Sequence, residues 1–123
     1  MGKEVWVEFS EKTYNNYLEL QKQAFLDKQQ GKQNSFNIQL LKAIEREKNN
    51  LKINPQYGIH IPRKNIPKVL ASRFGTDRLW KIDLVGFWRL IYTIVGDETK
   101  IIVLVLEFID HKKYDKLFGY RKK

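Results

Sequence analysis

Side chains of the types that bind and cleave phosphate esters lie close together in the last third of the chain. They are the cations Lys81, Arg89 and Lys112, the imidazole of His111 and the phenol of Tyr114. Cleavage of RNA without a metal needs a base for the 2′-hydroxyl proton, cations for the charge that builds on the phosphate oxygens, and an acid for the departing 5′-oxygen. These residue types therefore predict a site that binds a phosphodiester and can cleave it.

Each of these residues suits a particular step of that chemistry. His111 can take or give a proton near neutral pH, because imidazole titrates there. Arg89 can hold two phosphate oxygens through its planar guanidinium, a geometry that lysine lacks. Lys81 and Lys112 would add point charges on the same face.

The same residues also have simpler explanations. Asp110 could cap a C-terminal helix and leave His111 as a surface residue of its first turn. Arg89 could pair with Asp83 across a hairpin, which would give only a weak surface ion pair. Two histidines and dispersed acidic residues do not form a ligand cluster, so no metal and no cofactor is expected.

Charge indicates the kind of partner. The 123 residues include 23 Lys and Arg against 14 Asp and Glu, a net charge of +9. This excess favours a polyanion or an acidic protein as partner, although a merely soluble basic protein would share it. The absence of cysteine excludes disulfides and thiolate chemistry. With no signal-peptide pattern and no apolar run of about 20 residues, we expect a cytoplasmic single domain covering residues 1–123, without membrane contact.

Three predicted strands, over residues 79–84, 87–95 and 101–106, would position the candidate residues. In the first strand Lys81 lies opposite the apolar face, and in the second Arg89 does so. Gly86 is expected at the hairpin turn between them. The third run is apolar on both faces, which predicts a central strand covered on both sides.

The N-terminal half predicts one strand and two helices. Residues 4–9 alternate with period two, as a strand does. Ser10 can cap a helix over residues 11–30, and Asn34 or Ser35 can cap a second, more regular helix. With a short C-terminal helix, this order predicts an α+β fold in which the N-terminal strand and two helices pack on a mainly antiparallel sheet.

Residues 54–76 hold all three prolines and no acidic residue. Proline fixes φ and removes a donor, so a mostly extended loop is expected, with one short helix over residues 68–74. Such a long loop is usually functional or poorly ordered, and a solvated loop can also be basic. The candidate RNA-binding residues of this loop and of the flanking C-terminal segments are Arg63, Lys64, Lys68, Arg73, Arg78, Lys113, Tyr120 and Arg121.

The C-terminal half resembles the RelE/ParE superfamily, whose members are toxins of toxin–antitoxin pairs. The similar segments are residues 79–84, 87–94 and 109–112, which read Leu-Trp-Lys-Ile-Asp-Leu, Phe-Trp-Arg-Leu-Ile-Tyr-Thr-Ile and Ile-Asp-His-Lys. The tail, with Asp-His-Lys, Tyr and Phe-Gly-Tyr, is similar to that of the ParE-like branch. The resemblance covers the chain from residue 54 onward, and the N-terminal half by element order only. It implies a RelE-like fold.

The resemblance also implies roles for individual residues. Lys81 corresponds to a lysine that ribonuclease members place beside the scissile phosphate, and Arg89 to their phosphate-binding arginine. Lys112 falls where they carry a second arginine, and His111 matches a histidine common just before it.

Two positions depart from the ribonuclease pattern. Asp83 stands where those nucleases have a second lysine, which replaces a positive charge near the phosphate with a negative one. The catalytic tyrosine of some members would fall on Phe118, leaving Tyr114 and Tyr120 as candidates on either side.

Three functions are consistent with the sequence. The first is a metal-independent endoribonuclease that cuts messenger RNA at the ribosome, favoured by His111, Lys112 and Arg89. The second is a non-enzymatic toxin that inhibits DNA gyrase, as the resemblance to ParE implies, favoured by Asp83 and the displaced tyrosine. The third is a plain nucleic-acid-binding domain without toxin activity. A toxin implies an antitoxin, and the charge predicts an acidic, partly disordered one that folds along the basic groove.

Overall fold

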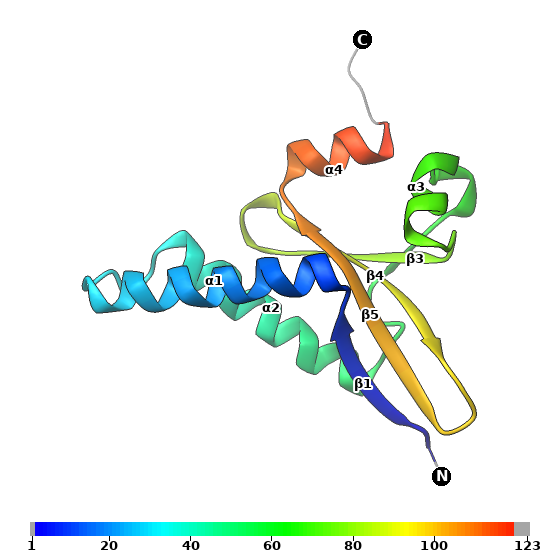
Figure 1. Cartoon of the computed structure of the whole chain (residues 1–123), viewed down its shortest axis with the longest axis horizontal. Helices are drawn as coiled ribbons and strands as arrows, with labels where there is room; N and C mark the ends of the chain where they lie inside the picture. The colour runs from blue at the N-terminus through cyan, green and yellow to red at the C-terminus, as the bar shows by residue number, and fades with distance from the viewer. Residues whose placement is uncertain (1, 120–123) are drawn as a thin grey trace.

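The computed structural model describes residues 2–119 and shows a five-stranded sheet with helices on both faces (Figure 1). The elements in chain order are β1 (Glu4–Phe9), α1 (Glu11–Gln29), α2 (Phe36–Ile53), β2 (Ile59–Ile61), the 3₁₀ turn η1 (Arg63–Asn65), α3 (Lys68–Phe74), β3 (Leu79–Asp83), the 3₁₀ turn η2 (Val85–Phe87), β4 (Arg89–Gly96), β5 (Lys100–Ile109) and α4 (His111–Phe118). The strand order is β1-β5-β4-β3-β2, with β1 parallel to β5 and every other pair antiparallel. The α+β class and the mainly antiparallel sheet are as predicted.

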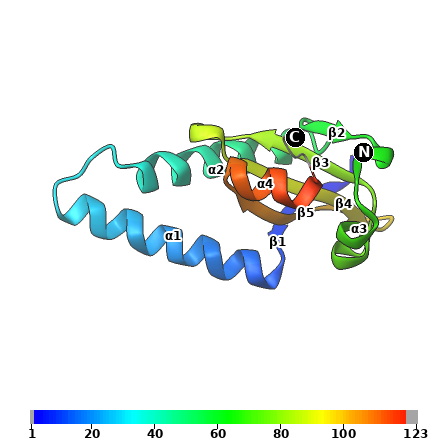
Figure 2. The same ribbon diagram turned by 90° about the horizontal axis from the view of Figure 1, so that it is seen from above.

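Each face of the sheet has its own core. Residues of α1 and α2, such as Ile44 and Leu51, pack on one face against Leu90 and Val103. Residues of α3 and α4 pack on the other face, where Tyr114 joins a separate cluster. Figure 2 shows the hairpin of α1 and α2 extending beyond the sheet. Within residues 2–119, no helix combines the length and apolar character that crossing a membrane requires.

The boundaries of α1 and α3 agree closely with the predicted ones, and one of the two caps predicted in the N-terminal half is formed. The amide of Ile38 donates to Ser35 Oγ at 3.2 Å, which caps α2. Ser10 is the N-cap residue of α1, but its hydroxyl donates to the Leu106 carbonyl at 3.4 Å and caps nothing. The Ser10 side chain therefore links the start of α1 to β5 by a hydrogen bond.

The predicted loop over residues 54–76 contains more structure than expected, since β2 and η1 precede the predicted helix α3. The hydroxyl of Tyr92 holds the start of this segment, donating to the Pro55 carbonyl and accepting from the Gly58 amide, both at 2.9 Å. A Cβ at position 58 would lie 2.8 Å from both Tyr92 Oη and the Lys81 carbonyl oxygen. Glycine at 58 thus allows the chain to approach β3 and form β2.

The turn between β3 and β4 has an unusual backbone. Gly86 and Phe87 both have positive φ, 66° and 64°, and the Trp88 amide donates to the Val85 carbonyl at 3.3 Å, as in a type I′ turn. A left-handed conformation costs a residue with a side chain roughly 1–2 kcal/mol. Gly86 was predicted at this turn, whereas a strained Phe87 was not. The turn sets the register in which Asp83 faces Arg89.

Candidate functional site

Two of the predicted cations meet over one aromatic ring. The guanidinium carbon of Arg89 lies 4.6 Å from the centroid of the Tyr114 ring, and Lys81 Nζ lies 5.6 Å from it. Both distances are in the range of cation–π attraction. Tyr114 itself is buried and stacks on Phe118, so its ring forms a fixed base for the two charges. Lys81 and Arg89 therefore share one face of the sheet, as predicted.

Arg89 is held on several sides. Its Nε donates to Asp83 Oδ1 at 3.0 Å, so the ion pair considered from the sequence is formed. Its Nη1 lies 3.2 Å from His111 Nδ1. The Arg89 side chain is only 18% exposed, against 65% for Asp83. The guanidinium is thus presented in one orientation at the surface.

The contacts of His111 define its tautomer. Arginine has only donors, so Nδ1 of His111 must accept the hydrogen bond from Arg89. The ring proton then sits on Nε2, which lies 3.0 Å from Asp115 Oδ2. In this arrangement the lone pair of Nδ1 is turned toward Arg89, and the N–H of Nε2 is turned toward Asp115.

Helix α4 brings some of its candidate residues to this cluster and leaves others outside. Asp110 Oδ1 accepts from the Lys113 amide at 2.8 Å, which caps α4 and places His111 in the first turn. His111, Tyr114 and Asp115 follow the i, i+3, i+4 spacing and lie on one side of the helix. The side chain of Lys112 is exposed, and within residues 2–119 no hydrogen bond, ion pair or ring contact joins it to another side chain.

Most of the predicted RNA-binding residues lie on η1, on α3 or just after it, and α3 shares a core with α4 on one face of the sheet. Two of them are neutralised: Arg63 pairs with Asp77 at 3.0 Å, and Arg73 pairs with Glu107 at 3.2 Å. The exposed cations without an ion pair in the described part of the chain include Lys64, Lys68, Arg78 and Lys113. Tyr120 and Arg121 lie outside the described residues.

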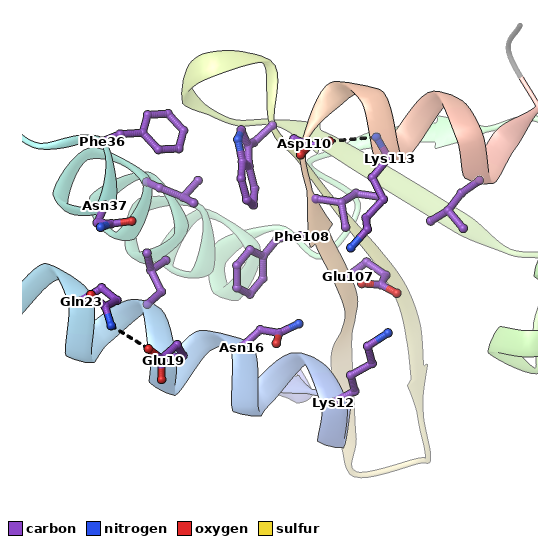
Figure 3. Close-up of a pocket in the computed structure, with 15 residues that line it drawn as sticks. Lys12, Asn16, Glu19, Gln23, Phe36, Asn37, Glu107, Phe108, Asp110 and Lys113 are labelled. Carbon is purple, nitrogen blue, oxygen red and sulfur yellow. Dashed lines mark hydrogen bonds between the residues drawn. The ribbon is translucent and has the colours of Figure 1, made fainter.

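A hollow in the described part of the chain lies away from this cluster. It has a volume of about 380 Å³ and lies between α1, α2, β5 and α4, where Asn16 and Phe108 line it (Figure 3). Its charged lining residues nearly cancel: Lys12 and Lys113 against Glu19, Glu107 and Asp110. A polyanion needs a net positive wall, so this cavity does not suit one.

A smaller hollow, of about 260 Å³, adjoins the cluster. Lys81 and Asp83 line it together with the exposed Tyr57. Nowhere in residues 2–119 do three or more His, Asp or Glu side chains form a group that could hold a metal ion. The geometry thus places the candidate site at Lys81, Arg89, His111 and Tyr114, and its chemistry is that of cations and an imidazole.

Sequence reasoning missed two residues of this site. Asp115 lies four residues after His111, and that helical spacing was a usable signal once α4 was predicted. Phe87 lies with its ring centroid 6.4 Å from that of His111. No pattern in the sequence shows that a phenylalanine at this turn takes a positive φ.

Comparisons with known proteins bear on the fold. No protein-family model and no curated protein sequence matches the chain. Its structure is similar to that of a YoeB/ParE toxin from Agrobacterium tumefaciens, with a TM-score of 0.55 and 14% identity, covering 86% of this chain and 98% of that one. The RelE/ParE-like fold implied by the sequence resemblance is thus confirmed.

Proposed function

We propose that this chain is the toxin of a toxin–antitoxin pair, and that it cleaves messenger RNA without a metal. The fold supports a toxin. The observation that carries the nuclease assignment is the 3.2 Å separation of Arg89 Nη1 and His111 Nδ1 above the Tyr114 ring. A phosphate-binding group and a proton-transfer group within one hydrogen bond of each other are what such cleavage requires.

A reaction can be derived from these contacts. The substrate phosphate binds the guanidinium of Arg89, which then leaves Nδ1 of His111. That nitrogen takes the proton of the 2′-hydroxyl, and the 2′-oxygen attacks phosphorus. The bond to the 5′-oxygen breaks, this oxygen takes a proton from solvent, and a 2′,3′-cyclic phosphate remains. Lys81 and Arg89 stabilise the charge on the phosphate oxygens, and Asp115 stabilises the imidazolium.

The proposed partner is an acidic antitoxin. The net charge of +9 and the unpaired lysines around the cluster, Lys64 and Lys68 among them, support it. An acidic segment that folds across this face would cover Arg89 and His111 and neutralise the excess charge. Co-expression with a neighbouring small acidic reading frame should yield a complex that dissociates at high salt, because salt screens charge pairs. Failure to co-purify would contradict this partner.

One observation favours the alternative, a ParE-like toxin that inhibits DNA gyrase without catalysis. Arg89 Nε already donates a hydrogen bond to the Asp83 carboxylate, so this carboxylate lies at an edge of the guanidinium that a phosphate would use. Inhibition of gyrase supercoiling by the purified chain, unchanged in Arg89→Ala, would favour this alternative.

The nuclease assignment is tested with purified protein, single-stranded RNA and EDTA. We expect cleavage by the wild type, and losses of roughly 100- to 10,000-fold in His111→Ala, the range of general base catalysis. The other histidine offers a matched control, because His60 packs on Trp80 away from the cluster. His60→Ala should cleave as the wild type does. Equal activity of His111→Ala and His60→Ala would remove the proposed mechanism.

A further inference from the structure

Phe87 is an exposed aromatic residue held in a strained conformation. Its φ is 64°, a region that bulky residues rarely adopt, and the residue is 77% exposed. It belongs to neither hydrophobic core and packs against neither from its edge. The strain therefore cannot be explained by packing of the ring in the interior. Strained residues that the fold maintains without such a gain are typical of functional sites.

The geometry of the turn explains why the ring is at this position. A Cβ at position 86 would lie 2.6 Å from Cε1 of Phe36, so a side chain at the first central residue of the turn would have to displace the Phe36 ring. Phe87, the second, carries the exposed side chain of the turn, and the centroid of its ring lies 6.4 Å from that of His111 with a tilt of 59°. His111 in turn contacts Arg89. An open aromatic face thus stands one side chain away from the proposed phosphate-binding group.

We propose that Phe87 is the stacking platform for one unpaired nucleobase of the RNA, next to the phosphate held by Arg89. This inference rests on the proposed ribonuclease function and adds a substrate subsite to it. Bases of single-stranded RNA stack on aromatic side chains, and such stacking tolerates any base because every base has a π-face. The nearby cations bind the backbone of the same nucleotides.

Binding is measured with an RNA oligomer that carries 2′-deoxyribose at the cut site, so that cleavage does not interfere. Phe87→Ala should weaken binding by about 5- to 150-fold, the range found for loss of one stacked base. Phe87→Trp should keep the affinity. Phe25→Ala is the matched control, since Phe25 is 59% exposed on α1. It should bind RNA as the wild type does.

An abasic nucleotide identifies the stacked base. Placed at the contacted position, it should weaken wild-type binding as much as Phe87→Ala does, and the two changes together should cost no more than either alone. Phe87→Gly separates binding from folding. Its thermal midpoint should equal or exceed that of the wild type, because glycine relieves the positive φ, while its RNA affinity falls.

Four results would overturn the inference. Phe87→Ala could bind RNA as tightly as the wild type while losing growth inhibition, which would assign the ring to a protein partner. The abasic and Phe87→Ala effects could add fully, which would mean that the ring contacts no base. A wild type that neither binds nor cuts any RNA would contradict the proposed function, and the subsite with it. A Phe87→Ala variant that still cleaves RNA and binds it with unchanged affinity would contradict the subsite alone.

Discussion

Asp83 and Arg89 lie directly opposite each other in the antiparallel pair of β3 and β4, and Arg89 Nε donates to Asp83 Oδ1 at 3.0 Å. This contact orients the guanidinium over Tyr114 and, at the same time, places a negative charge where a phosphate would approach. The ion pair therefore has opposite effects on substrate binding. Because the Asp83 side chain is largely exposed to solvent, its charge can be removed by mutation with little effect on folding.

Asp83→Asn should bind RNA more tightly than the wild type, because the amide keeps the acceptor oxygen for Arg89 while the repulsive charge is lost. The free energy of unfolding should change by less than about 1 kcal/mol, as for other exposed ion pairs. Fluorescence anisotropy over a range of KCl concentrations measures the affinity. Glu98→Gln, which makes the same charge change in the exposed turn after β4, should have a smaller effect. Equal gains in both variants would mean that only net charge matters.

Tyr114 is predicted to act through its ring. Tyr114→Phe keeps the base for Lys81 and Arg89 and should retain cleavage, whereas Tyr114→Ala should lose it. The alanine variant should also lose roughly 3–5 kcal/mol of stability, as for other buried aromatic residues. Chemical denaturation and the RNA assay measure the two effects. A phenylalanine variant that folds normally but does not cleave would show that the hydroxyl takes part in the chemistry.

Asp115 is predicted to hold the proton of His111 on Nε2. In Asp115→Asn the charge that favours this tautomer is lost, so a larger share of His111 should carry its proton on Nδ1. Cleavage should fall by roughly 10- to 100-fold, less than on loss of the base itself. Nitrogen-15 NMR of the imidazole gives the tautomer without any reference to activity. An unchanged tautomer in the variant would contradict this role.

Tyr92 should make stability depend on pH at the alkaline end. Burial raises the pKa of Tyr92 from 10 to about 12. Between these values the unfolded chain loses the proton and the folded chain keeps it, so the free energy of unfolding falls as pH rises, by up to about 1.4 kcal/mol per unit. Tyr92→Phe should remove this part of the slope. It should also cost about 1–3 kcal/mol near neutrality, because the Pro55 carbonyl and Gly58 amide lose their partner. Urea denaturation at several pH values tests both effects, and identical alkaline slopes would contradict the assignment.

The sequence predicted those parts of the fold that depend on local patterns. Period-two alternation predicted β3 and β4, helical spacing predicted α1 and α2, and Asp110 was correctly considered as the cap of α4. The strand β2 was missed, because three residues are too short to show a period and their pairing depends on Tyr92, distant in the chain. Local rules cannot predict contacts that the tertiary fold alone creates.

The same limit applies to the site. Alternation was enough to predict that Lys81 and Arg89 share a face, because their positions depend on the pleat of the strands. The side chain of His111 contacts Arg89, whereas that of Lys112 does not. This difference depends on the rotation of α4 about its axis, which its cap and the packing of Tyr114 determine. The position of the Phe87 ring depends on the positive φ that this residue takes in the turn. Both were accessible only from the structure.

The central claim, RNA cleavage by Arg89 and His111, is tested most directly by induced expression in cells. Wild type and Arg89→Ala/His111→Ala are compared, with growth and the 5′ ends of messenger RNA mapped together. The control is the matched pair Arg46→Ala/His60→Ala, whose residues lie away from the cluster. The account predicts growth arrest with new RNA ends in the wild type and in the control, and neither in Arg89→Ala/His111→Ala. Growth arrest that persists in that variant, with no new RNA ends in any strain, would contradict the account.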